Sequence, residues 1–201
     1  MKKLFIPAKS DVKIEPLLKK VKLKGKIGVL TTVQHLDEVK KIKDKRFVIG
    51  GQILGCNASN AMKLKVDYLL YIGSGRFHPI QIALETNKEV YILNPFTKEF
   101  SKLEKKNVDR IKKKIKGAYL KYLNAKKVGV IVSTKPGQNK KFDIKTDKEI
   151  YYFMCDNVTN QIENFPDIDI WINTACPRLA YENEFNVSMI NIDDLKAAEN
   201  L

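Results

Sequence analysis

The sequence predicts an α/β protein made of repeated small parallel-sheet βαβ domains, with two complete units and the tail of a third. Short apolar runs bounded by Asp, Gly, Asn or Pro are typical of strands buried on both faces, and they alternate with segments of helical period. The run KIGVLTT at Lys26–Thr32 returns about 100 residues later as KVGVIVST at Lys127–Thr134. Because strands that alternate with helices form parallel sheets, each repeat is expected to be one such unit.

Apolar runs and the residues that punctuate them define the elements of the first unit. The strands expected there are Lys26–Thr32, Phe47–Ile49, Gln52–Leu54, Tyr68–Ile72 and Val90–Leu93. The helices expected between them are Leu36–Lys43, a short helix after Cys56 that Asn57 and Ser59 can cap, and Ile80–Thr86. Ahead of this unit, Leu4–Ala8 is expected to be a single strand and Glu15–Lys22 a short helix.

The second unit opens with a helix expected at Lys105–Asn124, where apolar residues recur every three or four positions. The opposite face of this helix is rich in lysine, which fits a solvated surface better than a nucleic-acid-binding helix. The strands expected after it are Lys127–Thr134, Tyr151–Asn157, Asp169–Ala175 and Val187–Ile192, each with a counterpart in the first unit.

The repeat also predicts the domain limits. Leu4–Ala8 stands where the final strand of a unit would stand, in front of the next unit. We therefore expect residues 1–23 to be the tail of a missing first domain, 24–103 a second α/β domain and 104–201 a third. A lone strand cannot form a sheet, so the rest of the first domain is expected on another polypeptide, unless it was lost.

Composition narrows the class of protein and its partners. The net charge of +14 fits an anionic partner, such as RNA or an acidic protein, or else a solvated lysine-rich surface. We favour the second interpretation and expect no nucleic-acid binding, because the lysines are spread along the whole chain with few aromatic residues between them. No run reaches 18 apolar residues and no signal peptide is recognisable, so a cytoplasmic protein without membrane spans is expected.

Cys56 and Cys176 both follow expected strands and stand beside small, polar or cationic residues. Ligands bind at the carboxyl edge of open α/β sheets, so these thiols are candidate metal ligands, although cysteines are also often buried apolar residues. No CxxC pair exists, which makes a self-contained zinc site improbable and leaves a site assembled from distant cysteines. Cys155, the repeat counterpart of Cys56, is expected to be a core thiol.

Two further segments place polar groups at strand ends. DYLLYIGSGRFHP (Asp67–Pro79) ends a strand with Ser74, Gly75, Arg76 and His78. STKPGQ (Ser133–Gln138) follows another strand, where Lys135 and backbone N–H groups can bind a carboxylate or phosphate. The spacing of a P-loop is absent, as are a nucleophile elbow and an HExxH motif.

Five blocks, in the same order, resemble the diphthamide synthase family, whose archaeal enzyme performs the first step of diphthamide biosynthesis. The blocks are TTVQH (Thr31–His35), GQILGCN (Gly51–Asn57), YIGSGRFHP (Tyr71–Pro79), STKPGQ (Ser133–Gln138) and NTACPRLAYEN (Asn173–Asn183). The resemblance implies three similar α/β domains, each giving one cysteine to a 4Fe–4S cluster. Cys56 matches the ligand of the middle domain and Cys176 that of the last domain, whereas the first domain has no counterpart here beyond Leu4–Ala8.

The resemblance also implies the chemistry. Three thiolates on four irons leave one iron open for S-adenosylmethionine, which is split on reduction into a 3-amino-3-carboxypropyl radical that adds to a histidine of translation elongation factor 2. The residues then expected to line the S-adenosylmethionine site are Ser74, Gly75, Arg76, His78, Lys135 and Gln138. Arg76 or Lys135 is expected to pair with the methionine carboxylate.

Partners and alternatives follow from the same comparison. A shorter polypeptide is expected to supply the first domain and the third cysteine, in a homo- or hetero-oligomer. One alternative is an iron–sulfur enzyme like quinolinate synthase, which YIGSGRFHP and STKPGQ fit poorly. Another is a non-catalytic basic binding subunit that has lost its cluster, an interpretation that the presence of both Cys56 and Cys176 does not favour.

Overall fold

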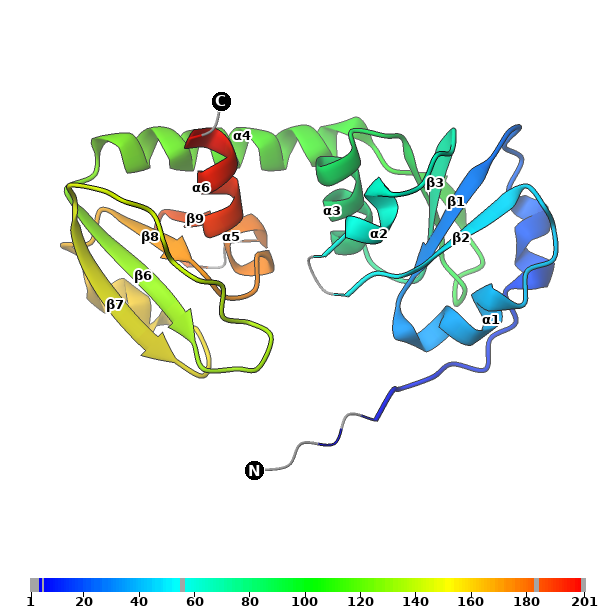
Figure 1. Ribbon diagram of the computed structural model, residues 1–201, viewed down its shortest axis with the longest axis horizontal. Coiled ribbons are helices and arrows are strands. Elements are labelled where there is room, and N and C mark those ends of the chain that lie inside the picture. The colour runs from blue at the N-terminus through cyan, green and yellow to red at the C-terminus, as the bar shows by residue number, and fades with distance from the viewer. Residues whose placement is uncertain (1–3, 5, 55–56, 183–184, 200–201) are drawn as a thin grey trace. The chain divides into compact units, whose positions relative to one another are not determined.

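The computed structural model describes residues 4, 6–54, 57–182 and 185–199. The chain divides into two compact units, Met1–Val108 and Asp109–Leu201, and each unit is described by itself (Figure 1). Both units contain a sheet of mainly parallel strands with helices between them, which confirms the predicted α/β class.

The first unit is built on a five-stranded sheet with the order β2-β1-β3-β4-β5. Its strands are β1 (Ile27–Thr31), β2 (Phe47–Gln52), β3 (Tyr68–Ile72), β4 (Val90–Leu93) and β5 (Phe100–Lys102). The first four run parallel, and β5 pairs antiparallel with β4. Every residue of β1 is buried, because this strand lies inside the sheet and both of its faces are covered.

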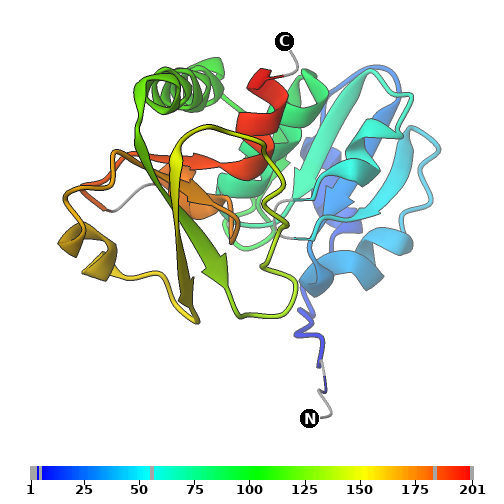
Figure 2. The same ribbon diagram turned by 60° about the vertical axis from the view of Figure 1, so that its left-hand side comes forward.

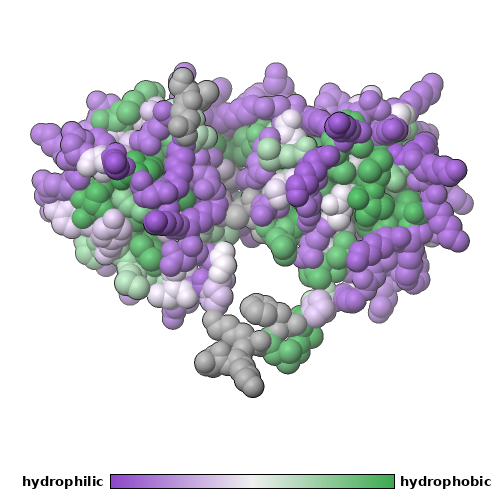
Figure 3. Space-filling model, viewed as in Figure 1, coloured by the Kyte–Doolittle hydropathy of each residue, from purple (hydrophilic) through white to green (hydrophobic). Residues whose placement is uncertain are grey.

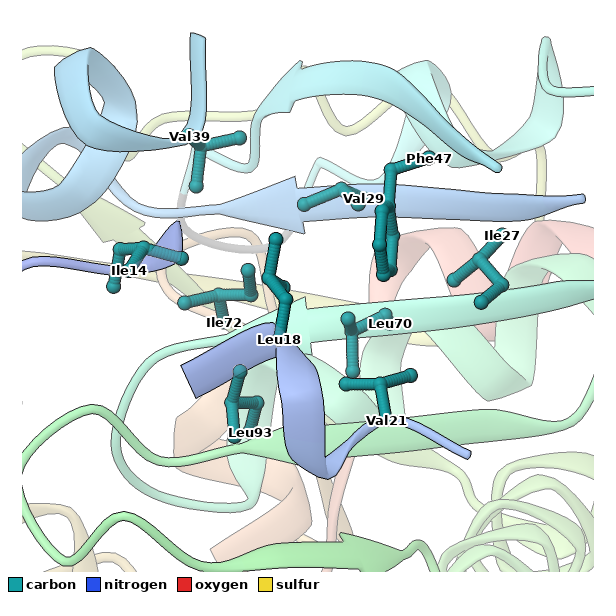
Figure 4. Packing of buried hydrophobic residues seen from close by; sticks show 10 residues of the cluster. All are labelled: Ile14, Leu18, Val21, Ile27, Val29, Val39, Phe47, Leu70, Ile72 and Leu93. Carbon is teal, nitrogen blue, oxygen red and sulfur yellow. The ribbon is translucent and has the colours of Figure 1, made fainter. Parts of the chain in front are cut away.

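Helices cover both faces of this sheet. They are η1 (Glu15–Lys20), η2 (Val33–His35), α1 (Leu36–Lys40), α2 (Ser59–Met62) and α3 (Phe77–Thr86). On one face, Leu18 of η1 and Val39 of α1 pack with Val29 and Leu70 in the cluster shown in Figure 4. On the other face, α2 and α3 pack against Leu69 and the alternate residues of the same strands.

The second unit has a four-stranded sheet with the order β7-β6-β8-β9, and all of its strands are parallel. Its elements are α4 (Lys105–Asn124, which begins before the unit boundary), β6 (Lys127–Ser133), β7 (Glu149–Cys155), η3 (Asn160–Asn164), β8 (Ile170–Asn173), α5 (Arg178–Glu182), β9 (Met189–Asn191) and α6 (Ile192–Glu199). Figure 2 shows α4 nearly end-on beside this sheet. Tyr122 of α4 and Leu195 of α6 pack on one face, and Ile162 of η3 and Ala180 of α5 pack on the other.

The order of the strands supports the internal repeat, because β2-β1-β3-β4 corresponds to β7-β6-β8-β9. A local detail repeats as well. Oδ2 of Asp67, just before β3, accepts a hydrogen bond from the backbone N–H of Lys26 at 2.8 Å. Oδ2 of Asp169, just before β8, accepts one from the backbone N–H of Lys127 at 2.9 Å. Each aspartate thus ties the start of its strand to the neighbouring strand.

Some boundaries in the first unit differ from expectation. The strand expected at Leu4–Ala8 was wrong for the described residues 4 and 6–8, which have no neighbouring strand to pair with. Phe47–Ile49 and Gln52–Leu54 were expected to be separate, but Phe47–Gln52 is one strand. The β1 register shifts between Val29 and Leu30, and Gly51 has a φ of +88° there, so the glycines form a bulge rather than a break.

Helix lengths were also predicted imperfectly. Helix α1 ends at Lys40, before the expected Lys43, and the expected helix at Glu15–Lys22 is the 3-10 helix η1. Helix α3 begins at Phe77 rather than Ile80, because Pro79 stands in its first turn, where its missing N–H costs nothing. Strand β5 and helices α5 and α6 were not predicted, since each is short and has little periodicity.

The visible surface of both units is mostly hydrophilic, as Figure 3 shows, in keeping with the high lysine content. Over the described part of the chain, every helix is too short or too polar to span a membrane.

Candidate functional site

A cavity of about 400 Å³ opens at the carboxyl ends of β6, β7 and β8 in the second unit. This is the edge at which ligands bind in parallel α/β sheets. Its walls come from the segments that follow these strands and from α5. The lining residues are Ser133, Lys135, Gln138, Asp156, Asn157, Val158, Ala175, Cys176, Arg178, Leu179, Glu182 and Phe185. The three residues predicted in this unit, Lys135, Gln138 and Cys176, therefore share one cavity.

Cys176 lies in the short loop between β8 and α5 and is half-buried. Its carbonyl oxygen accepts hydrogen bonds from the Leu179 N–H at 3.0 Å and from Nδ2 of Asn173 at 2.8 Å. These contacts fix the backbone that carries the thiol. The half-buried thiol thus lies on a cavity wall that also contains a lysine and an arginine.

Lys135 and Gln138 lie on the exposed turn after β6. The Lys135 ammonium donates to Oδ1 of Asn157, and its backbone N–H donates to Oγ of Ser133 at 3.2 Å. The backbone N–H of Gln138 donates to the carbonyl of Lys135 at 3.1 Å, and Gly137 supplies the positive φ of +75° that this turn requires. The partner of the Lys135 ammonium is a neutral amide, so this contact positions its charge without neutralising it.

The cavity presents charges of both signs. Lys135 and Arg178 are cations, and Asp156 and Glu182 are anions. Nε of Arg178 lies 2.5 Å from Oε2 of Glu182, one turn further along α5. Asp156 accepts a hydrogen bond from the hydroxyl of Thr134. Such a lining suits a ligand that carries both an ammonium and a carboxylate group.

Cys155 does not line this cavity. It ends β7, is half-buried and packs against the cluster that contains Ile131 and Trp171. Burial raises the pKa of the Cys155 thiol and the adjacent Asp156 raises it further, while Lys135 opposes the rise. A raised pKa disfavours the thiolate, so the chemistry of Cys155 is that of a core-facing thiol.

Strand register corrects the repeat relationship between Cys155 and Cys56. Thr31 pairs with Gln52 in the first unit, and the equivalent Val132 pairs with Met154 in the second. Cys155 is therefore equivalent to Ile53, which is 1% exposed in its own core. The sequences around the two cysteines are similar, so aligning them by eye pairs Cys155 with Cys56. Short apolar runs can be aligned in more than one register, and only the strand pairing distinguishes the registers.

The predicted residues of the first unit follow β3. Ser74, Gly75 and Arg76 are exposed and form the turn into α3, and Gly75 has a φ of +78° with open space around it. The half-buried His78 stacks on Tyr71 with ring centroids 5.5 Å apart, and its Nδ1 lies 3.3 Å from the Tyr71 hydroxyl. Burial raises the pKa of Tyr71 to about 12. The hydroxyl therefore keeps its proton at neutral pH.

Cys56, the other predicted iron ligand, lies outside the described residues. Elsewhere in the described ranges, no three His, Cys, Asp or Glu side chains come together as a metal site.

Sequence reasoning did not select Arg178, Glu182, Asp156 or Asn157 as site residues, yet all four line the cavity. A signal was present for each pair. Arg178 and Glu182 have the i, i+4 spacing of a helical ion pair, and Asp156-Asn157 directly follows a strand. Because α5 was not predicted, the first pair could not be placed.

Comparisons with known proteins identify the family of this chain. The family model "Putative diphthamide synthesis protein" matches residues 1–200. A 2-(3-amino-3-carboxypropyl)histidine synthase from Methanocaldococcus jannaschii is 36% identical over 204 residues, covering 91% of this chain and 57% of that protein. The protein of the same name from Pyrococcus horikoshii is 33% identical over 209 residues, covering 90% of this chain and 60% of that protein.

A solved structure is similar over the same region. The crystal structure of Dph2 from Pyrococcus horikoshii with a 4Fe-4S cluster matches with a TM-score of 0.78 and 28% sequence identity. The match covers 94% of this chain and 63% of that chain. The chain thus spans about three fifths of the length of these relatives.

Proposed function

Because the chain belongs to the diphthamide synthesis protein family, we propose that it is part of a 2-(3-amino-3-carboxypropyl)histidine synthase. In this role it helps to transfer the 3-amino-3-carboxypropyl group of S-adenosylmethionine to a histidine of translation elongation factor 2. The observation that carries the proposal is the cavity of the second unit, where Cys176 shares a lining with Lys135 and Gln138. Each of these residues belongs to a segment that resembles the family.

Cys176 and Cys56 are the residues of this chain that hold iron. Cys176 suits the role because its thiol is half-buried on a polar cavity wall and its backbone is fixed by two hydrogen bonds. When bound and reduced by an external electron donor, a 4Fe–4S cluster would supply the one electron needed to split S-adenosylmethionine into methylthioadenosine and a 3-amino-3-carboxypropyl radical. Cys155 takes no part, since its raised pKa disfavours the thiolate form that binds iron.

The other site residues bind and orient S-adenosylmethionine. Its amino acid end carries an ammonium and a carboxylate, which complement the mixed charges of the cavity. Lys135 pairs with the carboxylate, since Asn157 holds its ammonium without cancelling the charge. In the first unit, Arg76 is a second cation, in the same turn as Ser74 and Gly75, and His78 lies in the first turn of α3 that follows.

The third cysteine comes from outside these 201 residues. The chain contains two repeat units, whereas the family resemblance implies three. Leu4 and Ile6 are 85% and 81% exposed, which leaves these two apolar side chains available to contact the remaining unit.

Iron analysis of cysteine variants tests the proposal. The tagged chain is purified anaerobically from its own organism with the polypeptides that accompany it, and iron, S-adenosylmethionine cleavage and transfer to elongation factor 2 are measured. Cys56→Ser and Cys176→Ser are expected to lower the iron content and abolish transfer. Cys155→Ser is the matched control and should stay near the parent in both measurements.

Two results would count against parts of this proposal. Unchanged iron in both the Cys56→Ser and Cys176→Ser complexes would remove the cluster assignment. If these 201 residues alone hold a full cluster and turn over at the rate of the complex, the reaction needs no third cysteine from outside them.

A further inference from the structure

A buried polar network lies beneath the loop that carries Cys176. It begins with Asn173 and Asn191, which are register partners at the ends of β8 and β9 and are 1% and 2% exposed. Nδ2 of Asn173 donates to Oδ1 of Asn191 at 2.8 Å. Two adjacent asparagines in a core are costly to bury unless their amide groups are all paired.

Both asparagines bond to the backbone around Cys176. Oδ1 of Asn173 accepts from the Ala175 N–H at 3.0 Å, and its Nδ2 also donates to the Cys176 carbonyl at 2.8 Å. Nδ2 of Asn191 donates to the Pro177 carbonyl at 3.3 Å. The residue before Cys176, the carbonyl of Cys176 and the residue after it are therefore all held by these two amides.

Asp194 closes the far end of the network. This half-buried residue lies in the first turn of α6, where Oδ2 accepts from Nδ2 of Asn191 at 2.9 Å and Oδ1 accepts from the Tyr181 hydroxyl at 3.0 Å. Burial and the neighbouring Asp194 raise the pKa of Tyr181, so this hydroxyl stays protonated and donates. Burial also raises the pKa of Asp194, and the hydrogen bonds from Asn191 and Tyr181 oppose that rise.

When Asp194 is ionised, its carboxylate gives this chain of amides a direction. A carboxylate only accepts hydrogen bonds, whereas an asparagine amide can donate from one end and accept at the other. Asn191 must therefore turn Nδ2 toward Asp194, which leaves its Oδ1 facing Asn173. Asn173 in turn presents Nδ2 to Asn191 and to the Cys176 carbonyl, and Oδ1 to the Ala175 N–H.

The first unit provides an internal comparison. Its β3–β4 register pairs Tyr71 with Ile92, at the positions equivalent to Asn173 and Asn191. No cysteine follows β3 there, and the residue at the place of Cys176 is Ser74. The paired asparagines thus occur in the unit whose third parallel strand leads directly to a cysteine, although the two sheets share one strand order.

We propose that Asp194 is a positioning residue, which acts through Asn191 and Asn173 to hold the Cys176 loop in the conformation that presents its thiol to the cluster. The link to a cluster rests on the proposed function. The ordering of the loop does not, because it is a property of the metal-free chain.

The test compares Asp194→Asn with Asp193→Asn in the metal-free 201-residue chain. Both variants remove one carboxylate from the same turn of α6, but the side chain of Asp193 pairs with Lys140 and not with Asn191 or Tyr181. The amide introduced by Asp194→Asn can donate a hydrogen bond to Asn191 as well as accept one. The orientation of the Asn191 and Asn173 amides is then no longer fixed. We expect the segment from Ala175 to Leu179 to exchange amide hydrogens about fivefold faster, the equivalent of one ordinary hydrogen bond.

Thiol chemistry separates positioning from general loosening. The rates at which iodoacetamide modifies Cys176 and Cys155 are read in the same sample by peptide mass spectrometry. If the Cys176 loop becomes less ordered, the rate at which Cys176 is modified should rise by about fivefold relative to the rate for Cys155. A variant that merely loosened the whole unit would raise both rates together.

Tyr181→Phe provides a second control. It removes one hydrogen bond to Asp194 but leaves the carboxylate that sets the direction, so its effect on the Cys176 loop should be much smaller than that of Asp194→Asn. The proposal is overturned if Asp194→Asn behaves like the parent, or if either Asp193→Asn or Tyr181→Phe has the same effect as Asp194→Asn. Unchanged iron in Cys176→Ser with a loosened Asp194→Asn loop would instead reject the proposed function and retain the loop-ordering role.

Discussion

His35 shows how one buried side chain adds a pH dependence to the first unit. It is 2% exposed, its ring lies 5.6 Å from that of Phe96, and its Nδ1 has no hydrogen-bond partner in the described residues. Burial lowers the pKa of His35 below its usual value of about 6.5. The folded chain therefore resists protonation at a position where the unfolded chain does not.

This difference predicts acid destabilisation. Below about pH 6.5 the unfolded state binds a proton that the folded state excludes, so the free energy of unfolding should fall as the pH is lowered toward the folded pKa. One proton limits the slope to about 1.4 kcal/mol per pH unit. Urea titrations between neutral pH and mildly acidic pH should show a shallower dependence for His35→Gln than for the parent. Equal slopes would show that the pKa of His35 is the same in the folded and unfolded states, which contradicts this account of its burial.

The position of Cys155 in the internal repeat could not be assigned correctly from the sequence. The sequence alignment of the two repeats matches Cys155 with Cys56. The strand pairing shows instead that Cys155 is equivalent to Ile53. The core role expected for Cys155 agrees with its position against Ile131 and Trp171. By contrast, the family resemblance implied one site for Lys135, Gln138 and Cys176, and the structure brings these three residues to one cavity.

At the scale of elements, glycines in β6 and α4 have opposite roles. A Cβ on Gly129 in β6 would lie 2.6 Å from Cε3 of Trp171, which is fully buried. A Cβ on Gly117, in the middle of α4, would meet nothing within 4 Å. Packing therefore requires a glycine at position 129, whereas Gly117 has no packing role and only lowers the stability of helix α4.

The two substitutions should change stability in opposite directions. Gly129→Ala overpacks the core against an indole that cannot move aside, and should lower the free energy of unfolding by about 1–3 kcal/mol. Gly117→Ala should raise it by about 0.5–1 kcal/mol, because alanine favours a helix. Denaturant unfolding measures both. A destabilising Gly117→Ala, or a neutral Gly129→Ala, would contradict the packing described here.

Elements with strong local signals were predicted well. Strands β3 and β4 and helix α4 have the limits expected from apolar runs and helical period. The failures had physical causes. The strand β2 passes through Gly50-Gly51 by a bulge, and the short helices α5 and α6 depend on tertiary packing rather than on their own periodicity.

At the scale of the whole molecule, the repeat connects fold and function. Two units with the same order of four parallel strands each place candidate residues at a carboxyl sheet edge. The second unit adds the asparagine pair beneath its cysteine, and the first does not. The sequence motifs were enough to locate the carboxyl edges of the two sheets. The hydrogen-bond network of Asn173, Asn191 and Asp194 could not be predicted, because it joins β8, β9, α5 and α6 through contacts that form only in the folded chain.

The central claim is that this chain is needed to modify a histidine of elongation factor 2. The most direct measurement is the mass of the histidine-bearing peptide of that factor, in the native organism with and without the gene for this chain. We predict that the peptide lacks the 3-amino-3-carboxypropyl group in the deletion strain. Returning the parent gene should restore the group, and returning Cys176→Ser should not. Full modification of the factor in the deletion strain would contradict the account.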